Sequence, residues 1–208
     1  MKTFNNIIET REQLRAVLKE PSELVTKKVL AKLDKYCGVF IATSPFVLLA
    51  TADSHGNTDI SPKGDPVGFV KVLNDKTLAI PDRPGNNRAD SLENIIENPK
   101  VGLIFLIPGK TETLRISGTA QIVRDQALRD SMAIRGRSPE LAIVVTVEEA
   151  FFHCSKCMIR SKLWEHKKWP SLEGLPRLAE TMVDAGKLDL TEEEMHEIVL
   201  NDERERLY

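Results

Sequence analysis

The stretch IPDRPGNNRADSLENIIENP, residues 80–99, passes from a strand into a polar loop and then into a short helix. Asn87 is suited to the N-cap position of this helix, and Pro99 is suited to end it. Three apolar residues recur at helical spacing and would pack the helix on a sheet: Leu92, Ile95 and Ile96. We therefore expect a strand, a loop and an amphipathic helix to meet at one end of a β-rich core.

The loop of this stretch is a candidate anion site. Free amides at a helix N-terminus attract negative charge, and Arg83 and Arg88 stand beside them, which suits a phosphate ester. The alternative is that the loop only caps the helix and that both arginines are solvated. A second polar cluster, ISPKGDP at residues 60–66, offers a hydroxyl, a cation and a glycine that could follow the edge of a flat ligand.

Short apolar runs bounded by turn residues lie on both sides of this stretch. Two hairpins are predicted, one turning at DSHGN, residues 53–57, and one at NDK, residues 74–76. Strand character is found at residues 46–51, 58–61, 69–73, 77–80, 101–107, 113–123, 142–147 and 150–154. We expect six or seven antiparallel strands from these eight runs. Few long crossovers separate them, which favours a closed or nearly closed barrel without exposed edges.

Helices are expected on both sides of the barrel. Apolar residues recur at helical spacing between Thr10 and Tyr36 with a break at Pro21, which predicts two short helices. From Leu172 onward the sequence is helical and acidic, and TEEE at residues 191–194 is a capping box. One overall domain is expected, with N-terminal helices packing on the barrel at 1–37, the barrel at 38–165 and a C-terminal helical extension at 166–208.

Composition narrows the class of protein. The formal net charge of −2 and a pI near 6.1 do not favour a nucleic-acid partner. The N-terminus has no apolar segment typical of a secretory signal, and no apolar run reaches the length of a membrane helix. We therefore expect a cytoplasmic protein with no membrane partner, and we expect its three cysteines to be free thiols.

The order of these motifs along the chain carries a family resemblance. After the first hairpin come ISPKG at 60–64, IPDR at 80–83, NR at 87–88, a helix ending in NP at 98–99, and LRISGTA at 114–120. This order, over residues 39–164, resembles the pyridoxamine 5′-phosphate oxidase-like flavin-nucleotide-binding proteins. The resemblance implies a mainly β, α+β fold: an antiparallel split β-barrel of the FMN-binding type, forming a homodimer with FMN at the subunit interface.

The resemblance also implies a set of FMN-binding residues. In that family a polar and basic cluster at the helix start binds the FMN phosphate, and Asn87 and Arg88 stand at the matching positions. Lys63 is expected to contact the phosphate together with them. Lys63 and Arg115 are also the candidates for stabilising negative charge on the reduced flavin. The implied cofactor-binding set is Ser61, Pro62, Lys63, Gly64, Pro81, Asp82, Arg83, Asn86, Asn87, Arg88, Arg115, Arg160, Ser161 and Trp164. The substrate is expected near Arg135, Arg137 and Trp164.

The activity that the resemblance implies is an FMN-dependent oxidoreductase, with the catalytic residues and the substrate left open. After Trp164 the sequence EHKKWP departs from the substrate-binding end of authentic pyridoxamine 5′-phosphate oxidases, so the chain looks more like the uncharacterised flavin-binding branch. Two alternatives remain. One is a flavin carrier or sensor without turnover, and the other is the same fold holding the deazaflavin F420 or a haem.

The segment HCSKC, residues 153–157, could be a redox dithiol or half of a zinc site. A zinc site needs a second ligand pair, and Cys37 is the one further cysteine. We therefore expect no metal site, and we interpret Cys154 and Cys157 as a pair of buried or half-buried thiols. No nucleophile elbow or Ser-His-Asp order supports hydrolysis.

Overall fold

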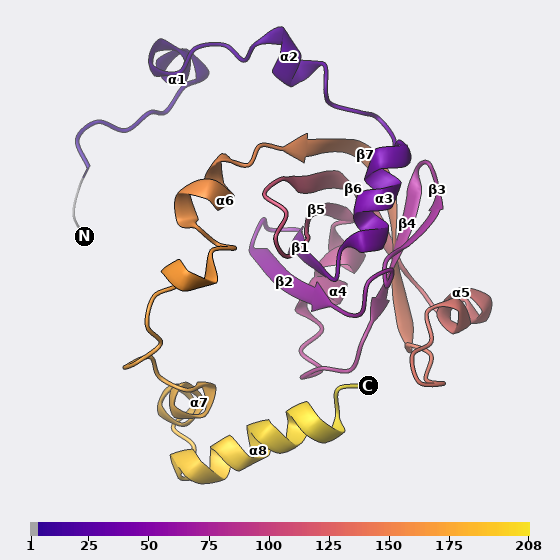
Figure 1. Cartoon of the computed structure of the whole chain (residues 1–208), viewed down its shortest axis with the longest axis vertical. Coiled ribbons are helices and arrows are strands. Elements are labelled where there is room, and N and C mark those ends of the chain that lie inside the picture. The colour runs from indigo at the N-terminus through magenta and orange to yellow at the C-terminus, as the bar shows by residue number, and fades with distance from the viewer. Residues whose placement is uncertain (1–3) are drawn as a thin grey trace.

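The structure, a computed structural model, describes residues 4–208, so residues 1–3 of the expected N-terminal segment lie outside the described residues. Its centre is an antiparallel seven-stranded sheet in the order β2-β1-β5-β6-β7-β4-β3 (Figure 1). The strands are β1 (Phe46–Ala52), β2 (Thr58–Gly64), β3 (Lys71–Asn74), β4 (Thr77–Asp82), β5 (Lys100–Leu106), β6 (Thr113–Val123) and β7 (Leu141–His153). The predicted α+β fold, an antiparallel split barrel with flanking helices, is confirmed.

Alternating burial explains why these segments form strands around one core. In β1, Val47 and Leu49 are fully buried, whereas the residues between and beside them are partly exposed. β6 shows the same alternation, with Leu114 and Ile116 fully buried. Successive side chains of a strand point to opposite faces, so the apolar face of the sheet encloses a single main core.

The longest pairing in the sheet, between β6 and β7, contains an irregularity. Ser117 pairs with Glu149 and Gly118 pairs with Val147, so Glu148 is an extra residue on β7. Two separate strands, at 142–147 and 150–154, were predicted here, and that prediction was wrong: β7 runs continuously through the bulge. A bulge lets one strand continue past an unpaired residue while bending the sheet.

The helices lie around this sheet. They are α1 (Arg11–Val17), α2 (Glu23–Thr26), α3 (Lys35–Thr43), α4 (Asp90–Glu97), α5 (Gln126–Ser131), α6 (Lys156–Ser161), the 3₁₀ helix η1 (His166–Lys168), α7 (Leu178–Gly186) and α8 (Glu192–Glu205). The predicted final helix begins as expected, because Thr191 and Glu194 form the capping box of α8. α7 and α8 pack on each other and bury Ala179 and Met195.

Helix α3 is a correction to the sequence interpretation, which predicted no N-terminal helix beyond Tyr36 and placed the barrel from residue 38 onward. The Asp34 carboxylate accepts a hydrogen bond of 2.8 Å from the amide of Cys37 and so caps the helix. Cys37, Phe40 and Ile41 are buried at helical spacing against the main core. The cap and the 3.6-residue period therefore determine this segment, even though several of its residues favour strands.

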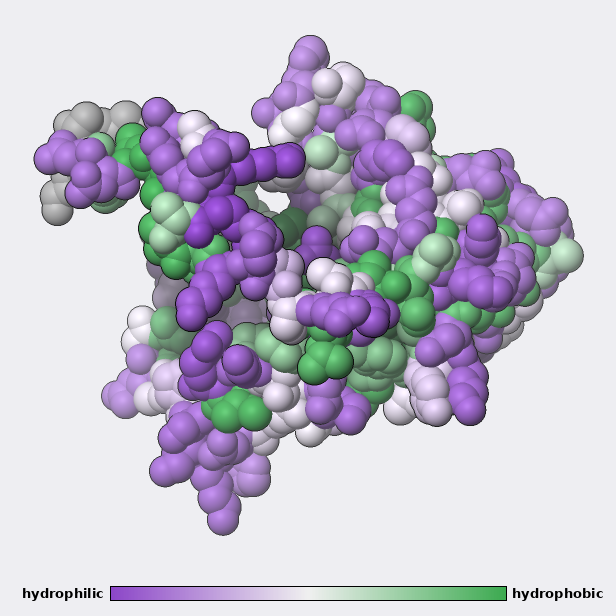
Figure 2. Space-filling model, turned by 90° about the horizontal axis from the view of Figure 1, so that it is seen from above, coloured by the Kyte–Doolittle hydropathy of each residue, from purple (hydrophilic) through white to green (hydrophobic). Residues whose placement is uncertain are grey.

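The two ends of the chain are arms that extend from the barrel (Figure 1). α1 and α2 contain no buried residue, and Figure 2 shows a gap between the N-terminal arm and the main body. At the other end, α8 returns the chain toward the open end of the sheet beside α4 (Figure 1). The expected division at residues 37 and 165 stays a prediction.

Within residues 4–208, none of the helices combines the length and the apolar character that crossing a membrane would require.

Candidate functional site

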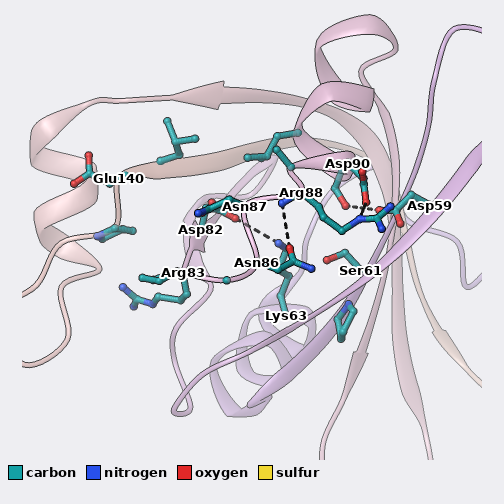
Figure 3. A pocket seen from close by; sticks show the side chains of 18 of the residues that line it. Asp59, Ser61, Lys63, Asp82, Arg83, Asn86, Asn87, Arg88, Asp90 and Glu140 are labelled. Carbon is teal, nitrogen blue, oxygen red and sulfur yellow. Dashed lines mark hydrogen bonds and ion pairs between the residues drawn. The ribbon is translucent and has the colours of Figure 1, made fainter. Parts of the chain in front are cut away.

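A cavity of about 950 Å³ opens at the end of the sheet where β2 and β4 finish (Figure 3). Its walls come from four parts of the chain: β2, the segment from the end of β4 through the first turn of α4, the loop before β7, and Tyr208. Ligand pockets in proteins commonly have volumes of about 300–1,000 Å³, so the cavity is large enough for a nucleotide-sized ligand.

The N-terminus of α4 faces this cavity. Ala89 is the N-cap residue, with a left-handed backbone (φ 59°), and no side chain accepts a hydrogen bond from the first turn. The prediction that Asn87 caps the helix was wrong: Asn87 lies two residues earlier and is itself left-handed (φ 58°). Left-handed backbone is tolerated best by Gly, Asn and Asp, so Asn87 serves the turn of the loop. The uncapped amides of α4 remain suited to an anion.

Arg88 lies beside these amides, and its side chain forms an ion pair at the surface. Its Nε lies 2.7 Å from the Asp90 carboxylate, and both side chains are largely exposed. The hydrogen bond that Arg88 donates to Asp90 raises the pKa of Arg88 above its usual range, so its charge is constant. Exposed ion pairs contribute little stability, so a phosphate that offers two acceptor oxygens can replace Asp90 as the partner of Arg88.

Lys63 and Asp82 connect the two strands that border the cavity. Lys63 Nζ lies 3.4 Å from Asp82 Oδ1, and only 21% and 25% of these side chains are exposed. In Figure 3, Lys63, Asn86 and Arg88 approach the same space from β2 and from the loop before α4. The site therefore places two cations close to an amide side chain at one end of the cavity.

A buried cluster supports another part of the wall: Arg83 and Tyr208 line the cavity, and both contact Asp65, which does not line it. The Asp65 side chain is 1% exposed, and its Oδ2 accepts a hydrogen bond of 2.6 Å from Arg83 Nε. Arg83 also donates from Nη2 to the backbone oxygen of Met132 at 2.8 Å. Tyr208 donates its hydroxyl to Asp65 Oδ1 at 2.8 Å. Arg83 is thus fixed by buried partners, unlike the exposed Arg88.

The structure divides the residues that the sequence singled out. The predicted residues that line the cavity are Ser61, Pro62, Lys63, Asp82, Arg83, Asn86, Asn87 and Arg88, together with Arg137 from the expected substrate region. The lining does not include Gly64, Pro81, Arg115, Arg160, Ser161 or Trp164. Their roles, and those of the lining residues, stay predictions.

Local contacts account for the residues outside the lining. Pro81 is fully buried in the sheet, and the Arg115 guanidinium lies over the Phe151 ring at 5.6 Å. The Trp164 indole donates a hydrogen bond of 2.7 Å to the backbone oxygen of Lys110. Arg160 and Ser161 lie on α6, which belongs to the C-terminal arm.

Sequence reasoning missed several residues of the site. The Asp65 cluster could have been suspected, because Asp65 lies in the ISPKGDP segment. The contributions of Asp59, Glu140 and Tyr208 had no sequence signal. Tyr208 in particular lies 143 residues from the Asp65 that it contacts.

The cysteines correct one interpretation. Cys154 and Cys157 are exposed free thiols, not buried or half-buried ones, because β7 ends at His153 and the chain leaves the barrel there. Cys37 is buried as a free thiol in the core. Among residues 4–208, no cluster of three or more His, Cys, Asp or Glu side chains is arranged to hold a metal ion.

Fold and site together define the class of protein: an antiparallel split barrel whose cavity is bordered by an uncapped helix N-terminus, the exposed Arg88 and the partly buried Lys63. Residues 33–154 match the family model described as pyridoxamine 5′-phosphate oxidase, which is more than half of the chain, and the chain belongs to that family.

Solved structures with a similar chain path include members from several bacteria. HupZ from Group A Streptococcus is 22% identical, with 58% of this chain and 93% of that chain covered and a TM-score of 0.47. A candidate pyridoxamine 5′-phosphate oxidase from Lactobacillus delbrueckii is 25% identical, with 59% and 95% covered and a TM-score of 0.46. An FMN-binding protein from Syntrophomonas wolfei is 14% identical, with 56% and 82% covered and a TM-score of 0.44. No curated protein matches the chain.

Proposed function

We propose that the chain binds FMN in this cavity and acts as a flavin-dependent oxidoreductase. One observation carries the proposal: the uncapped N-terminus of α4 opens on the cavity with the exposed Arg88 guanidinium beside it. Amides that lack a capping side chain are suited to a dianionic phosphate, and Arg88 can add charge-assisted hydrogen bonds. The FMN phosphate would lie on these amides with Arg88 and Asn87.

The remaining lining suits the rest of the cofactor. Ser61, Pro62 and Lys63 run along β2 at the cavity wall and would follow the ribityl chain and the ring. Lys63 is held near the wall by Asp82, with about a fifth of its side chain exposed. A cation in this partly buried position would stabilise negative charge on the pyrimidine edge of a reduced ring.

The flavin would supply hydride and electron transfer, and the residues of this chain would supply binding, orientation and charge. The carboxylate of Asp82 holds Lys63 in place and limits its reach. The partly buried Arg83 remains paired to Asp65, so it shapes the wall and is not free to take the phosphate. This division of roles assigns phosphate binding to Arg88 and tuning of the ring to Lys63.

We further propose that the chain forms a homodimer. Apolar side chains of the N-terminal arm are exposed, including Val17 at 72% and Leu24 at 83%. An isolated helix shorter than about 12 residues is marginal in water, and α1 has seven residues and no buried side chain. A second copy of the chain would cover these side chains and stabilise the arm.

The first experiment is the visible spectrum of the freshly purified protein, with mass spectrometry of any small molecule that denaturation releases. Bands at about 370 and 450 nm with released FMN would support the proposed cofactor. Release of F420 or haem would show that the cavity holds that cofactor and not FMN. A colourless protein that also fails to bind added FMN would reject the flavin.

Turnover is tested on the FMN-loaded protein. An oxidoreductase should oxidise NADH or NADPH with added electron acceptors at a rate well above that of free FMN. Tight FMN binding without such a rate would reject the enzyme and leave the carrier or sensor function.

A further inference from the structure

The last residue described, Tyr208, lies inside the cavity wall, although the other elements of the C-terminal arm lie outside the barrel. Helix α8 ends at Glu205, and the next three residues carry the chain to the open end of the sheet (Figure 1). Tyr208 is partly buried there, and it touches groups from two loops that are far away in sequence.

Three kinds of contact hold Tyr208. Its hydroxyl donates to the buried Asp65 carboxylate at 2.8 Å. Its ring has two guanidinium groups near it, with Arg135 Cζ 5.4 Å and Arg83 Cζ 5.9 Å from the ring centroid. Its backbone oxygen accepts a hydrogen bond of 2.5 Å from Arg137 Nη1. Each distance is within the range of a cation–π contact or a hydrogen bond.

Two of the residues that contact Tyr208, Arg83 and Asp65, favour a phenol ring with a hydroxyl. Arg83 donates from Nε to Asp65 and from Nη2 to Met132, so these partners fix its guanidinium beside the Tyr208 ring. Asp65 is almost fully buried, and Oδ1 would lose its hydroxyl partner if Tyr208 left. A buried carboxylate favours a ligand that can donate a hydrogen bond to it.

The Arg135 and Arg137 side chains are presented by a tight turn. Ile134 and Arg137 pair across it, and both central residues have positive φ, 51° at Arg135 and 76° at Gly136. Left-handed backbone is costly for arginine and is tolerated mainly by Gly, Asn and Asp. Arg135 therefore stands where a less restricted residue would fit with less strain, and its guanidinium lies over the Tyr208 ring.

We propose that Asp65, Arg83, Arg135 and Arg137 form a binding site for a small aromatic molecule with a phenolic hydroxyl at one end and an anionic oxygen group at the other. Tyr208 occupies this site as a ligand supplied by the chain itself. A molecule of this class binds by displacing Tyr208, with its hydroxyl on Asp65 and its anionic group on Arg137. The site would be the substrate end of the cavity, a role that rests on the proposed flavin function, whereas the binding itself does not.

The test uses ¹⁹F NMR of the full chain labelled with 3-fluorotyrosine, because Tyr36 and Tyr208 are the only two tyrosines in the sequence. Tyr208→Phe and Tyr36→Phe assign the two signals. The probe is 4-hydroxyphenylacetate, which carries the hydroxyl, the ring and a carboxylate. We expect the probe to move the Tyr208 signal to the position of an exposed tyrosine in a saturable way and to leave the Tyr36 signal unchanged.

Matched probes and variants make the result specific. Phenylacetate, which lacks the hydroxyl, and 4-hydroxyphenylacetamide, which lacks the charge, should each bind about tenfold more weakly or worse. Tyr208→Ala should tighten binding of 4-hydroxyphenylacetate by about tenfold, because the competing ring is gone. Adding Arg135→Ala to Tyr208→Ala should reverse part of that gain.

Three outcomes would overturn the proposal: a Tyr208 signal that does not respond to saturating probe, equal binding of all three probes, or no gain in Tyr208→Ala. None of these readouts needs flavin. If the protein binds the probe but not FMN, the proposed function is refuted and this site is not. If the protein binds FMN but the Tyr208 signal does not respond to the probe, this site is refuted and the proposed function is not.

Discussion

At the scale of single residues, Arg88 and Arg83 show how the same side chain takes different roles. Arg83 pairs with a carboxylate that is 1% exposed, whereas Arg88 pairs with one that is 43% exposed. Breaking a buried pair leaves an uncompensated charge, while breaking an exposed pair costs little. Arg83 therefore belongs to the structure of the wall, and Arg88 is free to serve a ligand.

Arg88→Ala should weaken FMN binding by on the order of 1.5–3 kcal/mol, because it removes a charge-assisted contact to the phosphate. Riboflavin, which lacks the phosphate, should bind the variant and the unchanged protein equally. Isothermal titration calorimetry with both ligands measures this difference. Lys100→Ala is the matched control, because Lys100 forms a similarly exposed pair with Glu148 and does not line the cavity. Equal losses for FMN and riboflavin would contradict the phosphate assignment.

The three cysteines should differ in how fast their thiols react with a thiol reagent. Burial raises the pKa of the Cys37 thiol to about 11, so almost none of it is thiolate at pH 8, and the side chain is shielded. Cys154 and Cys157 are exposed. Titration with a thiol reagent at pH 8 should therefore show two rapid equivalents in the native protein and a third only after denaturation. Rapid reaction of all three thiols, or the loss of one of the two rapid equivalents in native Cys37→Ala, would contradict this environment.

At the scale of elements, the β6–β7 bulge depends on Gly118. A Cβ at this position would clash with the backbone oxygen of Thr146, and the neighbouring strand has no flexible side chain there that could give way. The strands would have to separate locally, which disrupts the pairing that holds the two longest strands together.

Gly118→Ala should therefore lower the free energy of unfolding by on the order of 2–4 kcal/mol, measured by urea denaturation. Gly102→Ala is the matched control on the neighbouring strand β5. A Cβ at Gly102 would lie 3.8 Å from the Ala50 Cβ, which is an ordinary contact. That variant should be neutral or slightly stabilising, because alanine restricts the unfolded chain. Similar losses in both variants would show that the bulge does not need glycine.

Most of the sheet could be predicted from the sequence, because its strands are bounded by strong turn residues such as those at 53–57 and 74–76. The sequence also singled out the loop before α4, and its residues do line the cavity. Their role in ligand binding stays a prediction. Helix α3 was missed, although the cap at Asp34 was a usable signal, because strand-forming residues dominate the segment. Tyr208 could not be found at all, since no local pattern records a contact across 143 residues.

At the scale of the whole molecule, the chain has one well-packed body and two arms whose surfaces differ. The C-terminal arm buries Ala179 and Met195 between α7 and α8 and returns to the cavity through Tyr208. The N-terminal arm forms a backbone pair with the barrel at Leu30 and Ala150, but its first two helices bury nothing. An arm with exposed apolar side chains and little contact with its own body is typical of segments that pack on a partner.

If a second copy covers this arm, the double variant Val17→Ser/Leu24→Ser should weaken the dimer. Burying one such side chain contributes about 1.5–3 kcal/mol, and two-fold symmetry would remove each contact twice, so the dimer dissociation constant should rise by at least about tenfold. Sedimentation velocity over a concentration series measures this constant. Lys19→Ser, in the same arm, removes no apolar contact and should leave the constant unchanged. A protein that is monomeric at every concentration would refute the dimer, and a dimer that is indifferent to the double variant would show that its interface lies elsewhere.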